Sequence, residues 1–98
     1  MKTPADCQTM IELREAIDQL DQELIAMLAK RYTYIDRAAE LKMRVGMPPR
    51  TIDRIKQVVA QVRQHAKDRN LDPDLIEFIW RALIENSIAR EAKIMGHS

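Results

Sequence analysis

A run of 41 residues without glycine or proline, between Pro4 and Gly46, most constrains the fold of this chain. Within the run, apolar side chains recur at alternating spacings of four and three, the period of a helical packing face. They are Leu13, Ile17, Leu20, Leu24 and Met27. At 1.5 Å per residue, a helix over residues 8–44 has a length of about 55 Å. The run therefore predicts one very long N-terminal helix.

Two further helices are expected after the breaker formed by Gly46, Pro48 and Pro49, because proline cannot continue the hydrogen-bond ladder of a helix. The second helix begins after Thr51, a possible N-cap, and ends near Asn70, which tolerates a left-handed backbone. Its side chains expected to face inward are Ile52, Ile55, Val59 and Val62.

The third helix has the clearest start signal in the chain, with Asp72 as N-cap and Pro73 at the first helical position. It is expected to run to about Met95 and to stop at Gly96. We therefore predict an all-α fold of three helices, with residues 1–98 forming a single domain.

Composition narrows the class of protein. The chain has 98 residues, one cysteine, four aromatic residues and a net charge of +1. No metal-binding cluster, glycine-rich phosphate loop or nucleophile–base pair is visible, so we expect no metal and no cofactor. The start of the chain does not read as a signal peptide and no apolar run is long enough to span a membrane, so we expect a cytoplasmic protein that does not bind membranes.

The long first helix carries more apolar surface than two short helices can cover. A monomer rarely leaves a large apolar patch exposed to water. A symmetric homodimer, in which the long helices pack together, removes this difficulty. We therefore predict a homodimer.

Three cations interrupt the packing face of the long helix. Arg31 lies in the same heptad row as Ile17 and Leu24, and Lys42 also falls in an apolar row. A cation on such a face is costly unless an anion meets it, and that anion could be a substrate. Arg31 and Lys42 are about three turns apart and could hold a small dianion between them. Arg14 is too far along the helix to join them, so it would have to come from the partner subunit; alternatively, it pairs with an exposed acid such as Asp18.

The third helix places Ser87 and Glu91 on the continuation of its apolar stripe. The stripe consists of Ile76, Trp80, Leu83 and Ile84. Two polar residues that continue an apolar face form either a buried network or the lining of a ligand site. Beside inward-facing cations, the ligand site is favoured.

At these positions the chain resembles the all-helical (AroQ-class) chorismate mutases and the related isochorismate-pyruvate lyases. The resemblance covers nearly the whole chain. It rests on Leu13-Arg14-Glu15, Leu28-Ala29-Lys30-Arg31, Lys42, Ile52-Asp53-Arg54 and Leu83-Ile84-Glu85-Asn86-Ser87. It implies an intertwined homodimer of the chorismate mutase type that rearranges chorismate to prephenate without a cofactor, in the shikimate pathway of aromatic amino acid biosynthesis.

The resemblance also implies roles for single residues. Arg31 and Arg14 of the partner subunit would bind the two carboxylates of the substrate. Lys42 would reach a carboxylate and the ether oxygen, on which negative charge grows as the C–O bond stretches. Arg54 and Ser87 would add contacts. A cation fixed at that oxygen stabilises the transition state more than the ground state.

Three positions depart from the usual mutase pattern: Thr51 stands for an aspartate, Ile55 for a glutamate and Glu91 for a glutamine. The apolar Ile55 is similar to the lyase branch, whereas Glu91 departs from it. The alternative function is therefore that of an isochorismate-pyruvate lyase, which forms salicylate and pyruvate in salicylate biosynthesis.

Glu91 itself allows two hypotheses. Ionised, it would place negative charge beside an oxygen that gains negative charge, so that activity rises toward acidic pH and Glu91→Gln restores it at neutral pH. Alternatively, Lys42 or Arg54 neutralises an ionised Glu91, which then orients the cation.

A different class of function is a helical dimer that binds nucleic acid or protein through residues 41–69. This segment carries eight Lys or Arg and two acids. Interleaved aromatic residues are lacking, and the inward placement of Arg31 and Lys42 would be unexplained. We therefore expect a small dianionic substrate and no nucleic acid.

Overall fold

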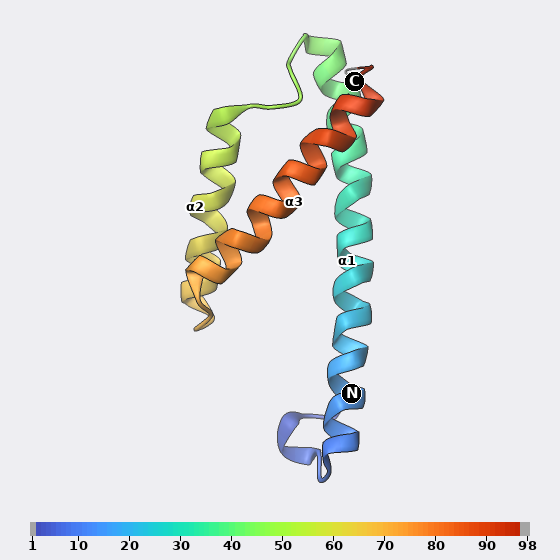
Figure 1. The fold of residues 1–98 in the computed structure, drawn as a ribbon, viewed down its shortest axis with the longest axis vertical. Helices are drawn as coiled ribbons and strands as arrows, with labels where there is room; N and C mark the ends of the chain where they lie inside the picture. The colour runs from blue at the N-terminus through green and yellow to red at the C-terminus, as the bar shows by residue number, and fades with distance from the viewer. Residues whose placement is uncertain (1, 97–98) are drawn as a thin grey trace. The chain divides into compact units, whose positions relative to one another are not determined.

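The computed structural model describes residues 2–96, and these form three α-helices and one short 3-10 helix (Figure 1). The elements are η1 (Pro4–Asp6), α1 (Met10–Val45), α2 (Ile52–Asp68) and α3 (Pro73–Ile94). The described residues contain no strand, so the predicted all-helical class is confirmed. The predicted starts of α2 and α3 agree with the observed ones, and the other predicted helix ends lie within about two residues of those observed.

Side chains at the start of α1 explain why it begins after Gln8. The backbone N–H of Glu12 donates to Thr9 Oγ1 at 3.1 Å, and the N–H of Gln8 donates to Glu12 Oε2 at 2.8 Å. These bonds satisfy N–H groups that have no partner inside the helix. The Gln8 N–H and the nearby Lys2 ammonium lower the pKa of Glu12 from its usual value of 4.5.

Both connections between the helices contain a residue with left-handed backbone, and the sequence predicts the one at Asn70. Asn70 has a φ of 59° after α2, and Gly46 has a φ of 72° after α1. The N–H of Met47 donates to the carbonyl of Lys42 at 2.9 Å, which closes the end of α1. At the start of α3, Asp72 accepts a hydrogen bond from the N–H of Asp74, as expected of an N-cap.

The contacts divide the chain into two compact units, Met1–Thr33 and Tyr34–Ser98, with the boundary inside α1. The first unit holds η1 and most of α1. The second holds the last turns of α1 together with α2 and α3. That residues 1–98 act as a single domain stays a prediction.

In the second unit, α2 and α3 form an antiparallel hairpin whose arms diverge away from the connecting loop (Figure 1). Its buried apolar side chains include Val59, Ala66 and Ile84. The prediction that Ile52 faces inward is wrong for the single chain, because Ile52 is 55% exposed. Ile52 is the first residue of α2, at the open end of the hairpin, where α2 and α3 are far apart (Figure 1).

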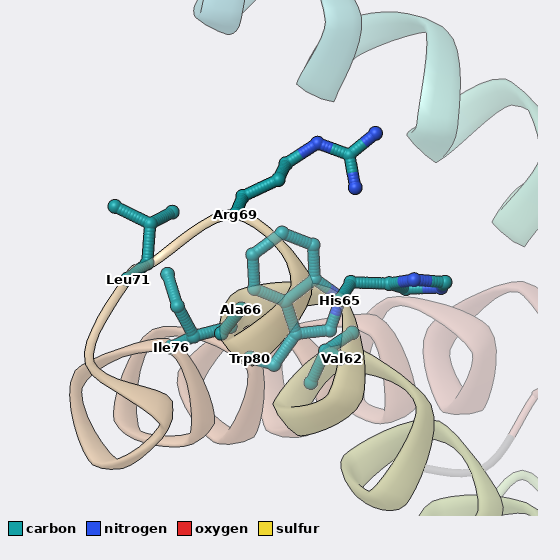
Figure 2. A pocket seen from close by; sticks show the side chains of 7 residues that line it. All are labelled: Val62, His65, Ala66, Arg69, Leu71, Ile76 and Trp80. Atoms are coloured by element: carbon teal, nitrogen blue, oxygen red, sulfur yellow. The ribbon is translucent and has the colours of Figure 1, made fainter.

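Near the closed end of the hairpin lies an apolar pocket, shown in Figure 2. Its lining comes from α2, α3 and the loop between them: Val62, His65, Ala66, Arg69, Leu71, Ile76 and Trp80. Trp80 is the only tryptophan of the chain. The pocket shares no residue with the predicted substrate site.

Much of the apolar face of α1 is open to solvent in the single chain. Four of the five residues that define its predicted packing period are exposed: Ile17, Leu20, Leu24 and Met27. An apolar patch of this kind usually marks a surface that another protein or a ligand covers. None of the helices described here is long and apolar enough to cross a membrane.

Candidate active site

Lys42 and Glu91 meet where the last turns of α1 face the end of α3. Lys42 Nζ lies 2.7 Å from Glu91 Oε1, with the Lys42 side chain 17% exposed and that of Glu91 6% exposed. The sequence predicts a site role for each of these residues, on separate helices, and the structure brings the two side chains into contact. Burial of opposite charges in contact is expected, because an isolated charge in this environment would be costly.

The Lys42 ammonium also donates to the backbone carbonyl of Pro49 at 2.8 Å. Pro49 is buried in the loop between α1 and α2. An ammonium has three N–H donors. The Pro49 carbonyl takes one of these donors and the contact with Glu91 is an ion pair, so two donors stay available to a ligand.

Two polar oxygens on α3 are buried without a hydrogen bond. Ser87 and Glu91 are each 4% exposed, and both Ser87 Oγ and Glu91 Oε1 lack a hydrogen-bond partner. Glu91 Oε1 is close to the Lys42 ammonium, but the approach does not have the angles of a hydrogen bond, so the contact counts as an ion pair only. Buried oxygens of this kind are rare in proteins and indicate polar groups kept for a ligand or for water.

Two further ion pairs flank this cluster. Arg90 on α3 donates to Asp36 on α1, and Arg50 in the α1–α2 loop donates to Glu85 on α3. The hydrogen bond from Arg90 lowers the pKa of Asp36 from 3.8, and the bond from Arg50 lowers the pKa of Glu85 from 4.5. Both carboxylates are therefore charged at neutral pH.

The remaining predicted residues of the second unit lie on α2 or directly before it. Thr51 is at the N-cap position, yet its side chain makes no capping hydrogen bond. Ile55 is half-buried one turn later. Arg54 is exposed and donates to Gln57 on its own helix at 2.6 Å, so in this structure it does not contact Glu91.

The two predicted arginines of the first unit differ in exposure. Arg14 is exposed, and the described residues show no ion pair between it and Asp18. Arg31 is half-buried, and its Nη1 atom is buried without a hydrogen-bond partner. A buried guanidinium nitrogen without an acceptor is costly, and a bound anion would supply the acceptor that it lacks.

The cluster offers electrostatic and hydrogen-bonding chemistry. It holds an oriented ammonium, a buried carboxylate and a buried hydroxyl. A fixed cation of this kind can stabilise negative charge that develops on an oxygen.

Sequence reasoning missed the Pro49 carbonyl and the Arg50–Glu85 pair. A backbone acceptor has no residue type that would reveal it. Arg50 and Glu85 are 35 residues apart, and only the folded loop shows that they meet. The one available signal was their position, each within five residues of a predicted site residue.

The chain is similar to known proteins with two different enzymatic activities. The chain is 29% identical over 93 residues to the isochorismate pyruvate lyase of Pseudomonas aeruginosa, which covers 95% of this chain and 91% of the lyase. It is 26% identical over 88 residues to the chorismate mutase of Methanocaldococcus jannaschii, covering 90% of this chain and 89% of the mutase.

A third relative is a longer protein. The T-protein of Enterobacter agglomerans is 34% identical over 79 residues, which are 81% of this chain and 21% of the T-protein. The family model described as chorismate mutase type II matches residues 13–92, a range that includes every predicted site residue. The chain therefore belongs to the type II chorismate mutase family.

Proposed function

We propose that this chain is a chorismate mutase, which rearranges chorismate to prephenate without a cofactor. The observation that carries the proposal is the half-buried Lys42 ammonium, which donates to the Pro49 carbonyl and pairs with Glu91 while two donors stay available to a ligand. In the reaction, the C–O bond of the ether breaks while a C–C bond forms. Negative charge grows on the ether oxygen, where an oriented cation stabilises the transition state.

The proposed site binds a small dianion. Arg31 and Arg14 of the partner subunit bind its two carboxylates, and Lys42 reaches the ether oxygen. Thr51, Arg54, Ile55, Ser87 and Glu91 line the rest of the site. The acceptor-free Nη1 of Arg31 and the partner-free Oγ of Ser87 support this assignment.

The proposed assembly is a homodimer. It is supported by the exposed apolar residues of α1, which a monomer would leave in water. It is also required by the role given to Arg14, because one rigid helix cannot bring Arg14 and Lys42 to the same small molecule.

A second candidate function is that of an isochorismate pyruvate lyase. Two observations favour it: the relative of that name covers 95% of this chain, and the half-buried residue 55 is the apolar Ile55. In that reaction a ring hydrogen moves to the enolpyruvyl group as the C–O bond breaks, leaving salicylate and pyruvate. The same cations would bind isochorismate.

Incubation of the purified protein with each substrate tests both candidates. Prephenate formed from chorismate supports the mutase, and salicylate with pyruvate formed from isochorismate supports the lyase. Turnover of neither substrate would contradict both.

Lys42→Ala is expected to lower kcat/KM by about 100- to 1000-fold, the effect of removing one donor to a developing anion. Lys56→Ala, at an exposed lysine of α2, is the matched control and is expected to keep wild-type activity. Circular dichroism of Lys42→Ala checks that the loss is not one of folding. Wild-type turnover in a folded Lys42→Ala protein would remove Lys42 from the mechanism.

A further inference from the structure

The loop between α1 and α2 is tied to α3 directly beside the carbonyl that holds Lys42. Arg50 Nη1 donates to Glu85 Oε1 at 2.9 Å, and Arg50 Nη2 donates to Glu85 Oε2 at 2.6 Å. The preceding residue, Pro49, is buried and accepts the Lys42 ammonium at 2.8 Å. One short stretch of loop therefore carries both contacts.

The two-bond contact restricts orientation as well as distance. Parallel N–H···O bonds between a planar guanidinium and a carboxylate fix how the two groups face each other. The proline ring also fixes φ at Pro49. Few backbone torsions then separate the Arg50–Glu85 bridge from the Pro49 carbonyl, so the bridge limits the direction in which this carbonyl points.

The Lys42 side chain needs such a constraint. Its ammonium is on a flexible four-carbon stem, and its three donors rotate freely unless acceptors hold them. Glu91 attracts the ammonium at 2.7 Å but does not orient a hydrogen bond, since Oε1 lacks the required angles. With one N–H held by the Pro49 carbonyl, the other two N–H donors take fixed directions, so this carbonyl orients the ammonium.

We propose that Arg50 and Glu85 are positioning residues, which fix the α1–α2 loop so that the Pro49 carbonyl aims the Lys42 ammonium at the substrate. The proposal rests on the proposed function, because that function gives Lys42 its role. Neither residue touches the substrate. They affect the reaction indirectly, because they hold the loop in the conformation that orients Lys42.

The exposure of the bridge allows its effect on activity to be separated from stability. The Arg50 and Glu85 side chains are 47% and 60% exposed. Exposed ion pairs contribute little to folding. We therefore expect Arg50→Glu and Glu85→Arg to fold with melting temperatures close to that of the wild type. Their kcat should fall roughly tenfold, with a smaller change in KM, because displacement of a catalytic group affects the transition state most.

The charge-reversed double variant, Arg50→Glu with Glu85→Arg, tests the coupling. It restores opposite charges across the loop and is expected to recover most of the lost kcat. The matched control is reversal of Arg37 and Glu40, an ion pair of similar exposure within α1. It is expected to leave kcat unchanged. Wild-type kcat in both single variants, or a double variant as impaired as the singles together, would overturn the proposal.

A second measurement needs no substrate. The NMR signals of the Lys42 side chain, assigned by their loss in Lys42→Met, report whether the ammonium is held. We expect them to move toward those of exposed lysines in Arg50→Glu and to return in the double variant. Unchanged Lys42 signals would overturn the proposal even if the protein turns over substrate. If the wild type acts on neither chorismate nor isochorismate, the proposed function fails, and these signals still decide the positioning.

Discussion

Glu91 and Lys42 form a neutral pair in the described structure, and a dianionic substrate would have to share the ammonium with the carboxylate. The separation of 2.7 Å between Nζ and Oε1 leaves the carboxylate beside the atom proposed to face the ether oxygen. A negative group at this place opposes the charge that develops in the reaction. Glu91 therefore affects both binding and turnover.

The first prediction concerns Glu91→Gln. Removing the negative charge and introducing an amide N–H donor is expected to raise kcat/KM at pH 7 by about tenfold or more. Steady-state kinetics of the wild type and the variant at pH 7 measure the difference.

A loss of activity in Glu91→Gln would support the other role of this residue. If Glu91→Gln lowers kcat, the carboxylate acts by orienting Lys42, which is the second hypothesis derived from the sequence. Ser87→Ala is a useful companion, since it removes a neighbouring buried oxygen without changing charge.

The candidate site could be predicted in part because polar residues on apolar faces stand out. Lys42, Ser87 and Glu91 were found in this way, and the structure shows two of them in contact and all three at least half-buried. The Pro49 carbonyl could not be found, because its direction depends on the loop conformation. Whether Arg14 and Arg31 join the site stays a prediction.

At the scale of elements, the end of α2 depends on a left-handed residue. Asn70 has a φ of 59°, and its N–H donates to the carbonyl of Lys67 at 3.2 Å. A side chain with a β-carbon is strained in this region, and asparagine less than most.

We predict that Asn70→Ala destabilises the protein by about 1 kcal/mol, whereas Asn70→Gly is neutral or slightly stabilising. Urea unfolding of the three proteins measures the difference. Equal stability of Asn70→Ala and Asn70→Gly would show that the left-handed conformation does not limit stability.

Arg63 links the two arms of the hairpin near its closed end. It donates to Asp74 and to Glu77, each at 2.9 Å. Hydrogen bonds from Arg81 and Arg63 lower the pKa of Glu77 from 4.5. A carboxylate with a lowered pKa in the folded state stabilises the fold above its usual pKa and loses this effect as the pH falls through the lowered value.

The expected result is that Arg63→Met melts at a lower temperature than the wild type at pH 7, and that the difference shrinks below about pH 4. Thermal unfolding followed by circular dichroism measures both proteins. Arg69→Met, at an exposed arginine of the same hairpin, is the control and should show no such dependence. A difference that is independent of pH would assign the effect of Arg63 to packing.

The helices were predicted well because their signals are local. The absence of breakers between Pro4 and Gly46, and the Asp72-Pro73 start, place three helices within two residues of the observed ends. The inward prediction for Ile52 failed because the divergence of α2 and α3 is a property of their packing. Heptad position alone carries no information on it.

At the scale of the whole molecule, the proposed homodimer requires each site to combine residues of two chains. Mixed dimers of Arg14→Ala and Lys42→Ala would then contain one site with both residues intact. Random association after joint refolding makes about half of the dimers mixed, and each mixed dimer has one intact site of its two. The mixture of two inactive proteins should therefore recover about a quarter of wild-type activity.

A matched pair of variants controls this experiment. Arg31→Ala and Lys42→Ala are both proposed to act within one subunit, so their mixed dimers contain no intact site and should stay inactive. Sedimentation measures the dimer directly. A monomer at micromolar concentration, or no recovery in the Arg14 mixture, would contradict the shared site.

The exposed apolar residues of α1 have a consequence for the chain in the cell. Before it meets a second copy, each new chain would present Leu24 and Met27 to chaperones and proteases. Surplus chains would then be degraded at low levels of synthesis, while assembled ones would persist. The cellular amount of active enzyme would rise more steeply than the rate of translation.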